Sequence, residues 1–215
     1  MKSAPKKIKI IDYGLGNLFS VKQALLQAGA DAEITSDYRE VLSAEALVLP
    51  GVGAFPEAMK NLKKNGLDRA ILESLSQNKK LMGVCLGLQL LFESSEEFGA
   101  SAGFGLLKGQ VKLLPQEFQG KKLHIPQIAW NRIHPKSQPW QNSPLNHLSD
   151  GAYMYFVHSY YVAPTDPADI LTETSYEGFR YTSSILHKNI FAVQFHPEKS
   201  AAAGVDIYKN WLQTV

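Results

Sequence analysis

The sequence has only one cysteine, a net charge of only +2 and no long apolar run, and each of these features excludes a class of protein. One cysteine cannot form an internal disulfide and fits a reducing compartment, so we predict a cytoplasmic protein. The small net charge provides no strongly basic surface for nucleic acid or an anionic membrane. No apolar run approaches the length of a membrane span. The expected partners therefore include neither nucleic acid nor a membrane.

Metal-ligand spacings are also absent. The chain contains neither Cys-x-x-Cys nor His-Glu-x-x-His, so we expect no metal and no cofactor. Hydrophobic residues make up 45% of the sequence and charged residues 20%, a composition typical of globular chains. A length of 215 residues suits one α/β domain. We predict a single domain over residues 1–215, in which the basic residues 1–7 form a disordered tail.

Short apolar segments alternate with helical patterns through the first half of the chain, which predicts an α/β fold with an open, mostly parallel sheet flanked by helices. After residue 98, β-prone segments follow one another and predict an additional antiparallel β portion in the C-terminal half. Strands are expected at 8–13, 32–35, 46–49, 81–84, 152–157, 159–162, 170–176, 181–186 and 190–195. Helices are expected at 18–28, 56–64, 68–77 and 200–212. The stretch 135–144 is polar and proline-rich, so we expect it to be an exposed loop.

The chain is organised around residues 81–92. Their apolar start predicts a buried strand, and the helical spacing that follows, up to Phe92, predicts a helix packed back on the sheet. Cys85 falls at the switch, between Gly83 and Gly87, as in a nucleophile elbow. A helix N-terminus there favours the nucleophilic thiolate. A lone cysteine after an apolar strand is also common as a small buried hydrophobe, so this stretch alone leaves both roles open.

A second candidate element is Phe195-His196-Pro197-Glu198, which follows another apolar strand. A cysteine nucleophile needs a base, and the base needs a partner that orients it. His196 is the one histidine of six with an acid this close after a buried strand. Cys85, His196 and Glu198 therefore form a candidate catalytic triad. A loop histidine beside a rigid proline, with a solvated Glu198, fits the same residues.

Two glycine-rich turns follow strands in the first half of the chain. Pro50–Phe55 contains Gly51 and Gly53, and its backbone N–H groups are candidates for stabilising an oxyanion, although an ordinary turn fits as well. Residues 14–17, with Asp37 downstream, partly match a dinucleotide fingerprint that lacks its third glycine. We expect an ordinary strand-to-helix turn there.

The motifs taken together resemble a known family. Gly-Val-Cys-Leu-Gly-Leu-Gln at 83–89 and Gln-Phe-His-Pro-Glu-Lys-Ser at 194–200 are similar to the class I, or triad, glutamine amidotransferases. Three further motifs, at 11–18, 49–55 and 155–161, resemble the branch formed by the glutaminase subunits of imidazole glycerol phosphate synthase. The resemblance covers nearly the whole chain and implies a flavodoxin-like fold.

The resemblance also implies a reaction. Cys85 attacks the side-chain amide of L-glutamine, His196 transfers the proton to the leaving ammonia and Glu198 holds His196. The backbone N–H groups of Val52 and Leu86 form the oxyanion hole. The residues implied to hold glutamine are Gly53, Gln89, Glu97, Ser159 and Tyr160, although Glu96 lies beside Glu97 and competes for that role.

In such enzymes the ammonia passes to a cyclase subunit with a (β/α)8 barrel, which forms imidazole glycerol phosphate and an aminoimidazole carboxamide ribotide in histidine biosynthesis. The resemblance thus implies a heterodimer, with Trp130 and Lys199 facing the partner. One segment departs from the pattern, because Gln127 and Ala129 replace the usual His and Gly. A paralogue that feeds another synthetase, for example in surface-sugar amination, fits this departure. A stand-alone cysteine hydrolase on a related fold and a catalytically silent binding subunit also fit the sequence.

Overall fold

Five parallel strands form one half of the central sheet in the computed structural model, which describes residues 4–136 and 140–215. Their order is β2-β1-β3-β4-β15, and every neighbouring pair is parallel. The carboxyl ends of these strands lie at one edge of the sheet, where ligands bind in open α/β folds. The strands are β1 (Lys7–Ile11), β2 (Asp31–Thr35), β3 (Ala46–Leu49), β4 (Lys80–Val84) and β15 (Ile190–Val193).

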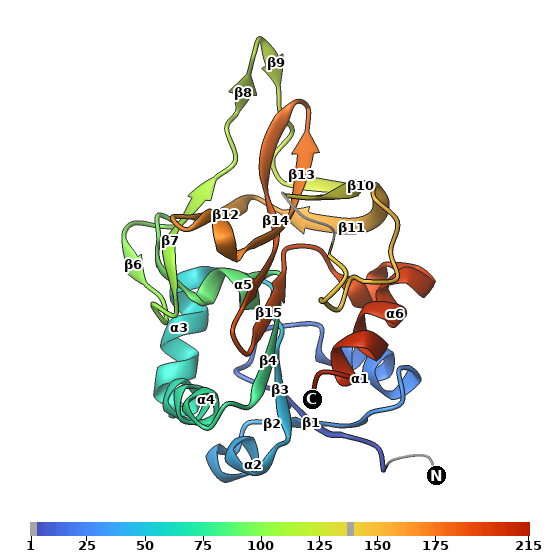
Figure 1. Cartoon of the computed structure of the whole chain (residues 1–215). Helices are drawn as coiled ribbons and strands as arrows, with labels where there is room; N and C mark the ends of the chain where they lie inside the picture. The colour runs from blue at the N-terminus through green and yellow to red at the C-terminus, as the bar shows by residue number, and fades with distance from the viewer. Residues whose placement is uncertain (1–3, 137–139) are drawn as a thin grey trace.

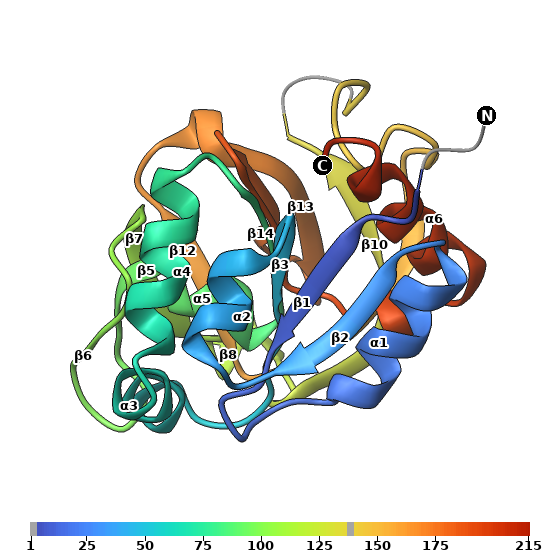
Figure 2. The ribbon, with the colours of Figure 1, turned by 90° about the horizontal axis from the view of Figure 1, so that it is seen from below.

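Helices cover both faces of these strands, as the alternation of buried side chains requires. Ile10 packs in the core against α1 and α6, whereas its neighbour Ile11 packs on the opposite face with α2, α3 and α4. Figure 2 shows α1 and α6 on one side of β1 and β2, and α2, α3 and α4 on the other. The helices are α1 (Leu18–Gln27), α2 (Tyr38–Ser43), α3 (Phe55–Lys64), α4 (Leu67–Ser76), α5 (Leu86–Leu90) and α6 (Ala201–Leu212).

The second half of the sheet is mostly antiparallel and continues from β15 in the order β14-β12-β7-β5-β6. A ribbon of β10 and β11 joins this half through β13 and rises above the parallel strands (Figure 1). The predicted α/β fold with an added antiparallel portion is therefore confirmed. The remaining elements are β5 (Phe92–Ser95), β6 (Ser101–Ala102), β7 (Leu107–Leu113), β8 (Glu117–Phe118), β9 (Lys121–Lys122), β10 (Gln127–Pro135), β11 (Ala152–His158), β12 (Tyr160–Pro164), β13 (Ile170–Tyr176), β14 (Phe179–His187) and the 3₁₀ helices η1 (Pro167–Asp169) and η2 (Pro197–Lys199).

Two local predictions need correction. The helix after the elbow ends at Leu90, and Phe92 begins β5. The six-residue helix α2 was not expected, and the Asp37 carboxylate caps it by accepting hydrogen bonds from the N–H groups of Arg39 and Glu40. Asp37 thus has a local structural role.

The predicted tail is shorter than expected, and the predicted loop is partly buried rather than exposed. Lys7 already begins β1, and the Lys6 carbonyl accepts a hydrogen bond from the Asp31 N–H, so the chain is held from Lys6 onward. In the predicted loop, Trp140 is buried and its indole N–H donates to the Leu148 carbonyl. Residues 1–3 of the tail and 137–139 of the loop lie outside the described residues. Within the described ranges no helix is long and apolar enough to cross a membrane.

Candidate active site

Cys85 occupies a strained backbone position between β4 and α5, with φ 55° and ψ −109°. A positive φ at a residue with a side chain costs roughly 1–3 kcal/mol and is concentrated at functional sites. The turn is closed by the Cys85 N–H, which donates to the Val193 carbonyl at 2.8 Å. It also needs Gly87, because a Cβ there would lie 1.8 Å from the Leu49 carbonyl oxygen. The predicted elbow geometry is confirmed.

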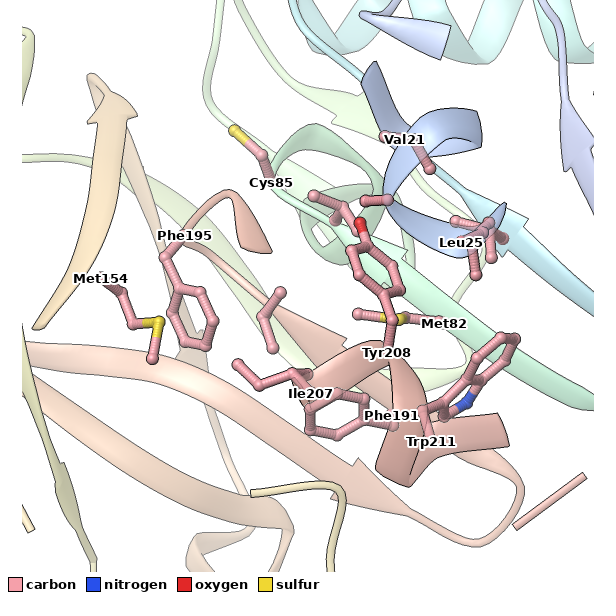
Figure 3. Close-up of a cluster of buried hydrophobic side chains, with 14 of the residues drawn as sticks. Val21, Leu25, Met82, Cys85, Met154, Phe191, Phe195, Ile207, Tyr208 and Trp211 are labelled. Carbon is pink, nitrogen blue, oxygen red and sulfur yellow. The ribbon is translucent and has the colours of Figure 1, made fainter. Parts of the chain in front are cut away.

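Cys85 lies at the edge of the hydrophobic core that packs between the sheet, α1 and α6. Figure 3 shows its sulfur turned away from the side chains of Met82, Phe195 and Tyr208. The residue is only 6% exposed. The core therefore packs against the backbone of the elbow, while the thiol points away from the core side chains.

His196 and Glu198 form a buried pair at the end of β15. His196 Nδ1 lies 2.8 Å from Glu198 Oε1, and the two side chains are 3% and 1% exposed. The main chain between them is fixed as well, since the His196 carbonyl accepts from the Ser200 hydroxyl. Helix α6 packs so closely on the main chain at Pro197 that a Cβ at Gly204 would lie 1.8 Å from the Pro197 carbonyl oxygen. The pair is therefore rigidly placed.

The surroundings of His196 raise its pKa to about 10. Burial acts in the opposite direction, but the Cys85 sulfur and the Glu198 carboxylate together outweigh it. Since the carboxylate can only accept, Nδ1 carries a proton, and Nε2 is the nitrogen whose protonation the raised pKa favours. Nε2 is buried and has no hydrogen-bond partner among the described residues. This arrangement suits a histidine that exchanges a proton with the Cys85 thiol.

A cavity of about 250 Å³ opens at Cys85. The predicted oxyanion residues Val52 and Leu86 line it together with Cys85. The cavity also contains all of the residues predicted to hold glutamine, namely Gly53, Gln89, Glu97, Ser159 and Tyr160, and three that the sequence did not indicate, Pro126, Val157 and His158. The structure therefore brings the predicted binding residues together at one place.

The structure distinguishes between the two adjacent glutamates. Glu97 lines the cavity, and its Oε2 accepts a hydrogen bond of 2.8 Å from the Phe55 N–H. Burial raises the pKa of this carboxyl. Glu96 instead accepts from the Leu113 N–H at 2.6 Å, away from the cavity lining. Of the two, Glu97 is the one placed to contact a ligand.

The glycine-rich turn before α3 contacts the elbow directly. The Leu86 N–H donates to the Gly51 carbonyl at 3.4 Å. The Tyr13 hydroxyl donates to the preceding carbonyl, that of Pro50, at 2.7 Å. Gly53 has φ 105°, a conformation that favours glycine. Of the two predicted oxyanion donors, the Leu86 N–H therefore faces one of the protein's own carbonyl groups.

Sequence reasoning missed a network of buried polar side chains that begins at the cavity with His158. His158 Nδ1–H donates to the Tyr160 carbonyl at 2.9 Å, and His158 Nε2 lies 3.2 Å from the Tyr181 hydroxyl. That hydroxyl lies 2.9 Å from Oε1 of Gln127, the residue that replaces the usual histidine. Burial lowers the pKa of His158 to about 4, so the ring is neutral at pH 7. These residues come from β10, β11 and β14, and no local motif links them.

The two residues predicted to face a partner meet at Tyr155 on β11. Trp130 is 50% exposed and packs edge-to-face on Tyr155, with ring centroids 6.0 Å apart. The Lys199 ammonium lies 5.6 Å from the same ring. Tyr155 in turn lies 6.5 Å, between ring centroids, from His196. The side chains of Ile128 and Tyr153 are also exposed on this ribbon. Tyr155 thus connects the exposed aromatic surface around Trp130 with His196 of the buried triad.

The reactive groups of the site are a thiol, an imidazole and a carboxylate, from Cys85, His196 and Glu198. In the part of the chain that the structure describes, no three His, Cys, Asp or Glu side chains are grouped so that they would hold a metal ion.

Comparisons with known proteins agree with this geometry. The family model described as glutamine amidotransferase class-I matches residues 9–214. The protein named imidazole glycerol phosphate synthase subunit HisH in Prochlorococcus marinus (strain NATL2A) is 45% identical over 207 residues, which cover 96% of this chain and 95% of that protein. The subunit of the same name in Aquifex aeolicus is 46% identical over 203 residues, 94% of each chain. The solved structure titled PurLQS from Thermotoga maritima has a similar fold, with a TM-score of 0.71 at 16% identity over 99% of both chains.

Proposed function

This chain belongs to the class-I glutamine amidotransferase family, among the HisH subunits of imidazole glycerol phosphate synthase, and we propose that it hydrolyses L-glutamine and supplies the ammonia to a cyclase subunit. The single observation that carries the proposal is the placement of Cys85 on a strained elbow at a 250 Å³ cavity, beside the buried His196–Glu198 pair. A structural cysteine needs neither the strain nor the cavity.

The first half of the proposed reaction forms a thioester. Glutamine lies in the cavity with its side-chain amide carbon against Cys85. The thiol proton passes to His196 Nε2 as the sulfur attacks, and Glu198 stabilises the imidazolium that results. The negative charge on the amide oxygen is held by backbone N–H groups, those of Leu86 and Val52. His196 then protonates the amide nitrogen, the C–N bond breaks, and ammonia leaves.

The second half releases glutamate. A water molecule gives a proton to His196 and attacks the glutamyl thioester, and the same oxyanion donors hold the second tetrahedral intermediate. The C–S bond breaks, and the sulfur recovers its proton from His196. The sum is glutamine plus water giving glutamate plus ammonia, and the triad returns to its starting state.

The exposed surface around Tyr155 is the proposed docking face for the cyclase, a (β/α)8 barrel in a heterodimer. Trp130 and Lys199 both contact Tyr155, and Tyr155 packs near His196, so a partner seated there lies close to the triad. Ammonia released at Cys85 would then pass to the partner to form the imidazole product of histidine biosynthesis. The predicted cytoplasmic location stays a prediction.

Three competing functions are less well supported. The curated relatives in several bacteria carry the HisH name at 41–46% identity over nearly the whole chain, which favours the histidine pathway over a sugar-aminating paralogue. A name that denotes a subunit also speaks against a stand-alone hydrolase. An intact His196–Glu198 pair speaks against a silent binding subunit.

The test uses the complex with the cyclase. We expect Cys85→Ala to abolish product formation from glutamine but to leave the partner able to use free ammonium. Glutamine-dependent synthesis by Cys85→Ala at the wild-type rate would overturn the proposed mechanism. Loss of the ammonium-dependent rate as well would show that the variant disrupts the assembly, and Cys85→Ser, which differs from the native side chain by one atom, then decides.

A further inference from the structure

A buried amide lies directly behind the nucleophile. Gln194 directly follows β15 and is 0% exposed. It is the single polar residue in the otherwise apolar segment 190–195. Its backbone N–H donates to the Ser183 carbonyl at 2.9 Å. A carboxamide in such a place destabilises the fold unless its polar atoms are hydrogen-bonded, so the partners of this side chain are informative.

Both ends of the Gln194 amide contact the site. Nε2 lies 3.6 Å from Cys85 Sγ, within the range of a hydrogen bond to sulfur. Oε1 accepts a hydrogen bond of 3.1 Å from Gln89 Nε2. The reversed orientation of the amide would place a carbonyl oxygen against the sulfur and two NH₂ groups against one another. The chemistry of the neighbours therefore fixes how Gln194 is oriented.

Gln194 in turn fixes Gln89. The Gln89 NH₂ group donates once to Gln194 Oε1 and once to the Tyr160 carbonyl, at 3.0 Å. Both of its N–H groups are then used, and the Oε1 atom is left as the free polar group of a residue that lines the cavity. A fixed acceptor suits an N–H group of the substrate, which glutamine offers in its side-chain amide and its α-ammonium.

The interactions of the Cys85 sulfur differ between the thiol and the thiolate. The Cys85 thiol is 3.8 Å from the Val157 carbonyl, which can accept the S–H proton. Once that proton has moved to His196, the carbonyl oxygen faces a negative sulfur and the interaction becomes unfavourable. The Gln194 N–H donor remains and becomes stronger, because its acceptor is now charged.

From these contacts we propose that Gln194 is a positioning residue: its amide stabilises the Cys85 thiolate at one end and, at the other, orients Gln89 so that an oxygen faces the substrate. This inference rests on the proposed glutaminase function and deepens it. It assigns two separable effects to one side chain, on the reactivity of the sulfur and on the binding of glutamine.

Two substitutions separate these effects. Gln194→Leu removes both the donor and the acceptor. Gln194→Glu keeps an acceptor for Gln89 but replaces the donor to sulfur with a carboxyl group. Thr174→Val serves as the matched control, because Thr174 is a buried strand residue whose hydroxyl has no partner among the described residues and which lies outside the cavity lining. Each variant is studied in complex with the cyclase.

The readouts are KM and kcat for glutamine and the pH dependence of Cys85 alkylation by iodoacetamide, followed by mass spectrometry. For Gln194→Leu we expect KM to rise and kcat to fall, each by about tenfold, and the alkylation midpoint to move up by about one pH unit. For Gln194→Glu we expect KM within about twofold of the wild type, with kcat reduced and the midpoint raised. Thr174→Val should leave all three unchanged.

Wild-type KM, kcat and alkylation midpoint in a folded Gln194→Leu complex would overturn the inference. If Gln194→Leu does not fold, Gln194→Glu decides: an unchanged midpoint with an unchanged kcat contradicts the proposal, and a selective loss of kcat supports it. Failure of the proposed function itself looks different, because the wild-type complex would then show no glutaminase activity and no fast alkylation of Cys85.

Discussion

The Gly51 carbonyl oxygen accepts a hydrogen bond from the Leu86 N–H at 3.4 Å, so one of the proposed oxyanion donors faces the protein's own backbone. The carbonyl of Gly51 and the N–H of Val52 belong to the same trans peptide and point in opposite directions. Rotation of that peptide would remove the oxygen from Leu86 and turn the Val52 N–H toward the cavity. Gly51 and Gly53 flank Val52 and make such a rotation accessible.

This relationship predicts that the isolated chain is a poor glutaminase. One missing oxyanion donor costs about 10²–10³ in kcat, and partner binding can shift the population of the two peptide conformations. Ammonia release should therefore rise by about 10² or more when a cyclase and its acceptor ligand are added. The measurement is steady-state ammonia release with and without the partner, and equal rates would remove the case for coupling.

A second prediction concerns the close approach of Tyr13 to Gly51. A Cβ at Gly51 would lie 2.1 Å from the Tyr13 hydroxyl oxygen. Gly51→Ala should lower the free energy of unfolding by roughly 1–3 kcal/mol through overpacking. Tyr13→Phe removes that oxygen, so the double variant should be more stable than the sum of the two single changes predicts. Urea unfolding of the four proteins measures the coupling, and strictly additive effects would show that the contact is not the cause.

His158 makes stability dependent on pH in a defined direction. Its folded pKa is lowered to about 4 by burial, whereas an unfolded histidine titrates near 6.5. Below about pH 6.5 His158 is protonated in the unfolded chain but stays neutral in the native protein. The free energy of unfolding therefore falls as the pH drops from 6.5 to 4, by roughly 3 kcal/mol from this group. His158→Asn keeps an N–H for the Tyr160 carbonyl but cannot titrate.

The comparison is urea unfolding of wild type and His158→Asn at pH 7 and pH 5. The variant is expected to lose less stability between these two values, whatever its stability at pH 7. Equal losses in the two proteins would mean that His158 is protonated in the native state or exposed to solvent, contrary to its burial.

The departure at Gln127 and Ala129 gives a fourth prediction. Gln127 is fully buried and bonded to Tyr181, whereas Ala129 lies in β10 opposite Phe156, in extended backbone that alanine adopts without strain. The double change Gln127→His with Ala129→Gly restores a titratable ring and a more permissive backbone beside the cavity. We expect it to change the ratio of stimulated to basal glutaminase rate and to leave catalysis intact.

That ratio is measured with the native partner and with a cyclase of the histidine pathway. An unchanged ratio with both partners would show that these two positions affect neither regulation nor partner choice. A fall in the stimulated and basal rates together would indicate a structural effect on the Tyr181–His158 network instead.

The features that the sequence predicted are those with local signals. The elbow around Cys85 and the His196–Glu198 spacing are short motifs attached to apolar strands, so their geometry follows from the strand that carries them. Helix α2 escaped prediction because six residues are too few to show a helical period. The orientation of the Gly51–Val52 peptide was also out of reach, because glycine permits more than one conformation there.

Contacts between distant strands could not be predicted from one sequence. Gln194 reaches Gln89 across 105 positions of the chain, and Tyr181 reaches Gln127 across 54. A single polar residue inside the predicted apolar strand 190–195 was the available signal for Gln194. It indicates a buried hydrogen bond but does not identify the partner. Such pairs become visible once the sheet order brings β15, β14 and β10 around the cavity.

The central claim is that nitrogen released at Cys85 goes to a cyclase partner without escaping to solvent. The most direct test supplies the wild-type complex with glutamine labelled with ¹⁵N in its side-chain amide, in the presence of excess unlabelled ammonium at a pH where little free ammonia exists. Mass spectrometry of the imidazole product then measures the source of its nitrogen. We predict a product that carries ¹⁵N almost throughout with the wild-type chain, and unlabelled product alone with Cys85→Ala. Product from the wild-type complex that carries the isotope ratio of the bulk ammonium would contradict it.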